Sequence, residues 1–273
     1  MIWAQKVVLV TGASSGIGLA VAKGAAERGA FVALVARRAA ALEAVAESLG
    51  AERAACFPLD VTDRFAIAQL PGRVVERFGR LDVVVNNAGV NHRGAVAERS
   101  ADELASILET NLVAPVLLSR AAIDHLAPGG VIVNVASLAG KVPVPHEATY
   151  SATKAGLRAF ARALAAELSA ELSARALHVG TVCPGPVDTS FFGDVAEVPD
   201  LVFSQPMSSA EEIARAVFEV VEERIDEVDV PMSSGKLATL GYLAPGLFRR
   251  LRPLLERLGA RNKRAFLARK GTE

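Results

Sequence analysis

Tyr150 and Lys154 are the residues whose types and spacing most clearly suggest chemistry, and they lie near the start of a long helical pattern. Positions i and i+4 share one face of a helix, so the phenol and the ammonium can point into the same cleft. A free tyrosine has a pKa near ~10, too high for a base at neutral pH, and a neighbouring cation lowers it. The pair therefore predicts a phenol that protonates a developing alkoxide, or deprotonates an alcohol in the reverse direction.

Ser137 is a third candidate, because it follows the predicted strand Val131–Ala136. Open α/β sheets bind their ligands at the carboxyl ends of the strands, where this hydroxyl can hold a substrate oxygen beside Tyr150. Each residue alone has an ordinary explanation: tyrosine and lysine at this spacing are common on helix surfaces, and a serine after a strand is often a turn or a cap. The catalytic interpretation therefore depends on a fold that brings the three together.

The fold is indicated by short β-forming runs that alternate with longer alanine-rich segments of helical pattern. The predicted strands are Val7–Thr11, Phe31–Ala36, Ala55–Leu59, Leu81–Asn86, Val131–Ala136 and Leu177–Cys183. The predicted helices are Ile17–Arg28, Ala39–Leu49, Asp63–Phe78, Ala101–Leu126, Ala148–Ala174 and Ala210–Glu223. This alternation predicts a Rossmann-like, doubly wound α/β fold with a mostly parallel sheet and helices on both faces. We expect a dinucleotide-binding and catalytic domain over residues 1–235 and an amphipathic, basic C-terminal extension over residues 236–273.

A glycine-rich turn joins the first predicted strand to the first predicted helix. In this turn Gly12 can reverse the chain, Gly16 can let the backbone approach a pyrophosphate, and Gly18 can let the helix pack closely. The helix N-terminus would then face the phosphates. The spacing is G-x-x-x-G-x-G, and glycines also occupy such turns in proteins that bind nothing, so the strand-turn-helix context is the supporting observation. The predicted phosphate-binding residues are Gly12, Ser14, Ser15, Gly16, Ile17 and Gly18.

The end of the second predicted strand indicates which dinucleotide binds. A carboxylate for the adenosine ribose is expected there, but the sequence reads Ala36-Arg37-Arg38 and has no carboxylate before Glu43. A guanidinium can grip a 2′-phosphate, which a carboxylate would repel. We therefore predict NADP(H) in preference to NAD(H), the alternative being that both arginines are solvated charges at the start of the next helix.

Taken together, these motifs resemble those of the short-chain dehydrogenases/reductases. They occur in the order and approximate spacing of that family over roughly residues 5–225: TGASSGIG at 11–18, NNAG at 86–89, Asn111, Ser137, YSATK at 150–154 and PGPVDT at 184–189. The resemblance implies that Tyr150 is the catalytic acid/base, that Lys154 lowers its pKa and binds the nicotinamide ribose, and that Ser137 positions the substrate oxygen. It also implies that Asn111 helps to hold a water in a proton relay, that Asp60 and Val61 flank the adenine, that Asn87 lies along the cofactor, and that Val187 and Thr189 contact the nicotinamide carboxamide.

Two departures from the family pattern affect assembly and substrate binding. In many members a terminal strand and a short glycine-rich segment help to form a tetramer, whereas here Asp226–Pro231 leads into a long basic tail. We expect a homodimer or homotetramer without assuming the usual contacts. His146 lies in a loop with Pro143 and Pro145 that commonly shapes the substrate pocket. We interpret it as a solvated histidine, the alternative being a ligand-binding or catalytic role.

The composition excludes several classes of protein. The formal net charge is +0, so we expect no nucleic-acid partner. Cys56 and Cys183 are far apart and lack CxxC spacing, which favours reduced thiols and no metal site. Neither a signal-peptide pattern nor an apolar run near the ~20 residues of a membrane span is found. We therefore expect a cytoplasmic protein that binds a small-molecule substrate.

The C-terminal tail poses a separate question, because residues 249–273 carry nine basic and two acidic side chains, a net charge of +7. A helical stripe consists of Leu247, Phe248, Leu251, Leu254, Leu255 and Leu258, although Pro253 would weaken or kink a continuous helix. Such a helix can pack on its own domain or on a dimer partner. It can also make a weak peripheral contact with anionic lipid and admit an apolar substrate. Besides a reductase of an apolar carbonyl compound, a non-catalytic NADP-binding regulator and a peripheral membrane protein therefore stay open.

Overall fold

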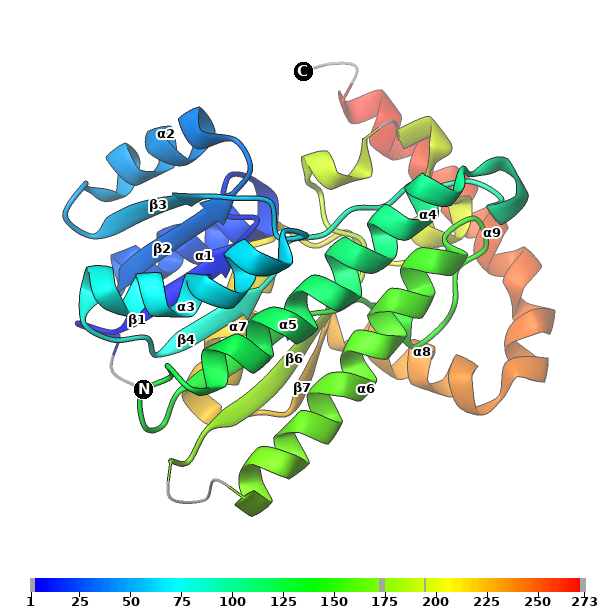
Figure 1. Cartoon of the computed structure of the whole chain (residues 1–273). Coiled ribbons are helices and arrows are strands. Elements are labelled where there is room, and N and C mark those ends of the chain that lie inside the picture. Colours follow the sequence, from blue (N-terminus) through cyan, green and yellow to red (C-terminus); the bar gives the residue numbers. More distant parts are fainter. Residues whose placement is uncertain (1–2, 172–174, 194, 271–273) are drawn as a thin grey trace.

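The computed structural model describes residues 3–171, 175–193 and 195–270, whose strands form one parallel sheet in the order β3-β2-β1-β4-β5-β6-β7 (Figure 1). The strands are β1 Val7–Thr11, β2 Phe31–Ala36, β3 Ala54–Pro58, β4 Val83–Asn86, β5 Val131–Val135, β6 His178–Pro184 and β7 Glu227–Val230. The helices are α1 Gly16–Glu27, α2 Ala39–Leu49, α3 Arg64–Phe78, α4 Ala101–Leu108, α5 Ala114–Ile123, α6 Ala148–Glu171, α7 Ala210–Glu223, α8 Met232–Leu243 and α9 Pro245–Lys270. The predicted doubly wound α/β fold is confirmed.

The sheet has one hydrophobic core on each face. Alternate residues of β1 divide between them: Val8 and Val10 join α1, α2 and α7, whereas Val7 and Leu9 join α3, α5 and α6. Every residue of β1 is buried, as expected for a central parallel strand covered on both sides. The chain passes outward from β1 to β3, returns to β4 and continues to β7, so the strand order reverses between β1 and β4. That reversal is where doubly wound folds bind their ligands.

The predicted helix Ala101–Leu126 is interrupted in the structure. A π-helical turn, Glu109–Val113, separates α4 from α5. Pro115 accounts for part of this, because a proline has no N–H with which to bond the carbonyl of Asn111 four residues earlier. The stretch Ala101–Ile123 is also long and apolar enough to span a membrane by length and composition, which corrects the expectation that no such run exists. Its buried side chains include Leu118, which packs in the core with α3 and α6.

Other predicted boundaries differ by one or two residues. Asp63, for example, is the N-cap of α3 and accepts hydrogen bonds from the N–H groups of Phe65 and Ala66, so the helix begins one residue later than predicted. The last residues of the predicted helix Ala148–Ala174 lie outside the described residues. Helix α9 continues through Pro253, where the sequence predicts a weakened or kinked helix.

Candidate active site

A cavity of about 830 Å³ lies at the carboxyl ends of the central strands. It brings together most of the residues that the sequence singles out, including those predicted from the resemblance. The predicted residues that line it are Gly12, Ser14, Ser15, Gly16, Ile17, Arg37, Asp60, Val61, Asn87, Ser137, Tyr150, Lys154, Val187 and Thr189. Gly18 and Asn111 are outside the lining.

The turn between β1 and α1 requires glycine at three positions. Gly12 and Gly16 have φ angles of +69° and +54°, a region that favours glycine. A Cβ at Gly12 would lie 2.8 Å from Nδ2 of Asn87, and a Cβ at Gly18 would collide with the carbonyl of Gly12. The Nδ2 of Asn87 also donates to the carbonyl of Thr11 at 2.9 Å, which ties this turn to the end of β4. The backbone therefore forms a cradle without side chains at the N-terminus of α1, and this cradle fits a pyrophosphate.

The adenosine end of the cavity carries positive charge. Arg37 and Arg38 follow β2 and line the cavity, and the Arg37 side chain is 72% exposed. Its guanidinium is 4.0 Å from the carboxylate of Asp60, a long and solvated pair that leaves the guanidinium able to bind another anion. This arrangement fits a nicotinamide dinucleotide with a 2′-phosphate.

Tyr150 and Lys154 project from the first turns of α6 into the same cavity, as their spacing predicts. The Nζ of Lys154 is 5.6 Å from the centre of the Tyr150 ring and donates to the carbonyl of Val135 at 2.9 Å. The Oγ of Ser137 accepts a hydrogen bond from the backbone N–H of Ala139 at 3.1 Å and donates to the carbonyl of Pro184 at 3.4 Å. The three side chains thus line one cavity at the end of β5.

The electrostatics of the pair correct the expectation drawn from the sequence. Burial raises the pKa of Tyr150 above its ordinary value and the carboxylate of Glu147 adds to this, whereas the nearby hydroxyl of Ser137 and the charge of Arg93 lower it. The predicted lowering by Lys154 is not observed in this structure. Burial lowers the pKa of Lys154 itself to about 8. The phenol is therefore a protonated group at neutral pH, which suits a proton donor.

Asn111 lies in the π-helical turn and is buried. Its Oδ1 accepts from the N–H of Val90 and its Nδ2 donates to the carbonyl of Val90, both at 2.8 Å. The side chain thereby fixes the loop that follows the NNAG motif. Its predicted part in a proton relay with Lys154 stays a prediction.

Arg93 and Glu147 are site residues that sequence reasoning missed. Their side chains are 8% and 6% exposed, line the cavity and form an ion pair at 2.6 Å. Arg93 also donates to the carbonyl of Phe192 at 2.7 Å. The position of Glu147, three residues before Tyr150, was the available signal, but nothing in the sequence pairs it with an arginine in another loop.

Two amides in the cavity lining were also missed. Within the described part of the chain, neither amide atom of Asn91 has a hydrogen-bond partner, and the same is true of the Oε1 of Gln205. Buried polar atoms are rarely left without a partner. These two side chains are therefore candidates for binding a polar group of a ligand.

Comparison with known proteins decides the family. The family model described as short chain dehydrogenase matches residues 6–199, which is more than half of the chain. The chain belongs to the short-chain dehydrogenase family. The roles that the resemblance implies for Ser137, Tyr150 and Lys154 stay predictions.

Individual members of the family resemble this chain over different lengths. The Bos taurus dehydrogenase/reductase SDR family member 7B is 35% identical over 54% of this chain and 48% of its own length. The ketoacyl reductase HetN of Nostoc sp. is 33% identical over 82% of this chain and 78% of its own. A short chain dehydrogenase from Burkholderia cenocepacia, solved in complex with NADP, has a TM-score of 0.74 and 34% identity, covering 81% of this chain and 92% of that one. The match to the first of these relatives thus spans about half of that protein's length.

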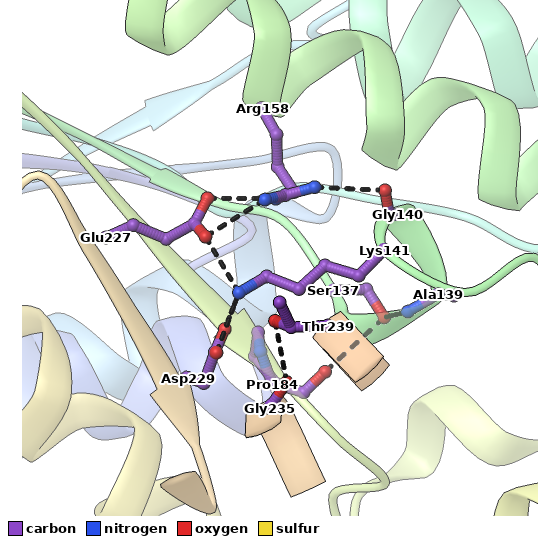
Figure 2. Close-up of polar contacts among 10 residues, drawn as sticks. All are labelled: Ser137, Ala139, Gly140, Lys141, Arg158, Pro184, Glu227, Asp229, Gly235 and Thr239. Carbon is purple, nitrogen blue, oxygen red and sulfur yellow. Dashed lines mark hydrogen bonds and ion pairs between the residues drawn. The ribbon is translucent and has the colours of Figure 1, made fainter. Parts of the chain in front are cut away.

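Figure 2 shows an ion network behind the Ser137 turn. The ammonium of Lys141 lies between two carboxylates of β7, 2.8 Å from Glu227 and 2.6 Å from Asp229. Arg158 pairs with Glu227 at 2.9 Å and donates to the carbonyl of Gly140 at 3.2 Å. The network thereby fixes the turn after β5 against α6 and β7.

Two carboxylates of this network also lie in a group of side chains that could bind a metal ion, although the sequence predicts no metal site. Cys183, Glu227 and Asp229 place potential ligand atoms within 4.8 Å of one another. However, Lys141 and Arg158 already neutralise the two carboxylates, and burial raises the pKa of the Cys183 thiol to about 12. A protonated thiol beside two cations is a poor ligand set, so we interpret this cluster as structural.

The end of the cavity next to Tyr150 is bordered by residues 190–193 and 195–205, which we call the lid, and by the C-terminal helices. Phe191 contributes a ring 6.0 Å from that of Tyr150. Leu237 and Phe248 line the cavity from α8 and α9, and so does Leu255. The leucine stripe predicted on the tail is therefore divided, since Phe248 and Leu255 face the cavity while its other members are exposed.

Proposed function

We propose that this chain is an NADP(H)-dependent oxidoreductase that exchanges a hydride with a carbonyl or alcohol substrate. The observation that carries the proposal is the convergence of Ser137, Tyr150 and Lys154 on one cavity that is continuous with the glycine cradle. The nicotinamide, when bound, supplies or accepts the hydride. The residues of the chain hold the substrate oxygen and move its proton.

In this proposal Tyr150 donates the proton. Its phenol is held protonated by burial and by the nearby carboxylate of Glu147, so it can pass a proton to the oxygen of a carbonyl as that oxygen becomes an alkoxide. Ser137, which lines the same cavity, would hold the substrate oxygen beside the phenol. Lys154, whose Nζ lies 5.6 Å from the centre of the ring, would bind the nicotinamide ribose, as the family resemblance implies.

NADP(H) is the proposed cofactor because two arginines stand where an NAD-binding carboxylate is expected. Arg37 and Arg38 line the cavity beside Ala36 at the end of β2. A guanidinium attracts the 2′-phosphate and gains nothing comparable from a ribose hydroxyl. The related Burkholderia cenocepacia enzyme was solved in complex with NADP, which supports the same choice.

The proposed substrate is largely apolar and carries a second polar group. Apolar side chains of the loop after Ser137, the lid and the tail line the substrate end, namely Val142, Val144, Phe191, Leu201, Leu237, Phe248 and Leu255. The unpartnered amide of Asn91 and the unpartnered Oε1 of Gln205 lie in the same lining. A ketone or aldehyde on a hydrocarbon frame with one further hydrogen-bonding group would match both features.

The test is NADPH oxidation, followed by absorbance, against a panel of aldehydes, ketones and quinones. Tyr150→Phe should reduce turnover by roughly 10²-fold or more, the contribution of a positioned proton donor, while leaving NADPH affinity unchanged. The chain offers a matched control in its other tyrosine, Tyr242, which is 72% exposed on α8. Tyr242→Phe should turn over like the unsubstituted protein.

Two results would overturn the proposal. Turnover retained in the Tyr150→Phe protein would remove the assigned role of the phenol. NADPH binding with no turnover of any panel member would favour the alternative of a non-catalytic NADP-binding regulator. We also propose a homodimer or homotetramer, as the family resemblance implies, which light scattering of the purified protein would measure.

A further inference from the structure

Helix α9 has an inner face that is fixed to the lid. The Nδ2 of Asn262 donates to the carbonyl of Phe203 at 3.0 Å, and the ring of Phe266 lies 5.6 Å from that of Phe203. A Cβ at Gly259 would collide with the carbonyl of Asp200, so the two backbones touch here. Figure 1 shows α8 and α9 (orange to red) on the side of the molecule away from α2 and β3 (blue). This anchored face defines which side of α9 remains open.

The open side carries leucines that remain partly exposed in the described structure. Leu247, Leu251, Leu254 and Leu258 recur at spacings of four, three and four, which places them on one face of the helix, and all four are exposed. Leu254 is the most exposed of them, at 64%. Leu240 and Leu243, directly before α9, are exposed as well. Contiguous exposed apolar residues of this kind mark a contact surface.

A row of arginines runs beside these leucines. Arg250, Arg257, Arg261 and Arg264 recur at spacings of seven, four and three, so they share the neighbouring face of α9, and all four are exposed. Among the residues that the structure describes, no carboxylate pairs with any of them. By contrast Arg252, at a different angle around the helix, pairs with Glu256 at 2.8 Å. The open side is therefore apolar along one strip and strongly basic along the next.

We propose that the leucine strip Leu247, Leu251, Leu254 and Leu258 docks into the surface of an anionic lipid bilayer. The leucines would lie at the boundary of the acyl chains, and the four arginines would reach the anionic headgroups. Because Phe248 and Leu255 of the same helix line the cavity, a docked molecule would hold its substrate end next to the bilayer. An apolar substrate dissolved in the membrane then has a short path to Tyr150.

Charge argues for lipid over a second copy of the chain. A two-fold dimer through this strip would bring two identical rows of arginines together, and like charges at such a contact oppose association. Anionic headgroups instead complement the net charge of +7 on residues 249–273. The docking is a property of α9 alone, although the supply of substrate to the cavity rests on the proposed function.

Vesicle sedimentation with the full chain tests the docking without any enzyme assay. The protein should bind vesicles of phosphatidylcholine and phosphatidylglycerol, bind pure phosphatidylcholine vesicles much more weakly, and be released by added salt. Leu247→Gln with Leu254→Gln should weaken vesicle binding by about a hundredfold, because docking would no longer bury two leucine side chains in the bilayer. Arg257→Gln should weaken it by about fivefold.

Matched controls separate docking from damage to the fold. Phe65→Gln removes an equally exposed apolar side chain on α3, and Arg162→Gln removes an exposed arginine on α6, so neither should change vesicle binding. Circular dichroism and NADPH affinity should be unchanged in all variants, because none of these residues lines the cavity. Deletion of the tail is a poorer test, since it also removes Phe248 and Leu255 from the cavity wall.

Several outcomes would overturn the docking while leaving the proposed activity intact. One is equal binding to neutral and anionic vesicles, and another is binding unaffected by the leucine substitutions. A third is a dimer in solution that the leucine substitutions dissociate and that vesicles do not displace, which would assign the strip to a second copy. Failure of NADPH oxidation alone would leave the docking result standing.

Discussion

The glycine-rich turn after β1 and the lid with α9 both line the cavity, but the turn does so with backbone atoms and the lid with side chains. At the turn, Gly12 and Gly16 adopt positive φ angles and Gly18 admits the carbonyl of Gly12. At the lid, a cluster of aromatic rings holds the cover in place: Phe192 lies 6.0 Å from Phe203 and Phe203 lies 5.6 Å from Phe266. The three glycine positions of the turn leave little room for a side chain, whereas the positions of the lid are occupied by packed side chains.

This difference teaches where binding specificity is built. A backbone cradle recognises what all ligands of a family share, here a pyrophosphate at a helix N-terminus. Packed side chains determine what distinguishes one substrate from another, because their shapes vary freely on a fixed frame. If so, substitutions in the two regions should affect different ligands, and each prediction below tests that separation.

The largest effect is expected at the lid, from Phe266→Ala. Phe266 is 7% exposed, and truncation of a buried phenylalanine costs about 3–5 kcal/mol. Loss of this anchor should loosen the lid and α9, raise the KM for the carbonyl substrate at least tenfold and leave the Kd for NADPH unchanged. Urea denaturation and steady-state kinetics would measure both quantities.

Phe65→Ala is the control for that substitution, since Phe65 is 74% exposed and outside the cavity lining. It should alter neither stability nor KM. If Phe266→Ala weakened NADPH binding as much as substrate binding, the two regions would not be separable.

The reverse result is expected at the turn, from Gly18→Ala. The added Cβ would meet the carbonyl of Gly12, and overpacking of this kind costs about 1–3 kcal/mol. The cradle should distort, so NADPH affinity should fall about tenfold, while the KM for the carbonyl substrate at saturating NADPH stays the same. Fluorescence titration with NADPH would measure the affinity.

Gly246→Ala provides the comparison for a glycine at the start of α9, where a Cβ would meet nothing within 4 Å. It should bind NADPH like the unsubstituted protein. An unchanged affinity in Gly18→Ala as well would mean that the close approach of this glycine to Gly12 has no part in cofactor binding.

Most of the fold could be predicted from the sequence, because periodicity and glycine placement carry the signal. The strands Val7–Thr11 and Phe31–Ala36 and the helices Ala39–Leu49 and Ala210–Glu223 have the bounds that their patterns predict. The break at Glu109–Val113 was missed although Pro115 signals it, because the apolar pattern continues across the break.

The parts of the site that escaped prediction depend on partners far apart in the chain. Lys141 meets Glu227 and Asp229 only because β7 joins the sheet beside β6. Likewise, the pairing of Arg93 with Glu147 requires the loops after β4 and β5 to meet over Tyr150. Glu147 also changes the pKa of Tyr150. Its spacing to Lys154 predicts a lowered value, whereas burial and the carboxylate of Glu147 raise it in the folded chain.

The smallest effect is expected from Arg37→Ser, and it tests a side chain at the cofactor end. Because Arg37 is 72% exposed, water and salt screen its charge, and its loss should weaken NADPH binding by only about threefold. NADH lacks the 2′-phosphate, so its affinity should not fall. Arg162→Ser, an exposed arginine on α6, should affect neither cofactor. The ratio of Michaelis constants for NADPH and NADH at low and high salt measures the effect, and an equal loss for both cofactors would contradict a phosphate-binding role for Arg37.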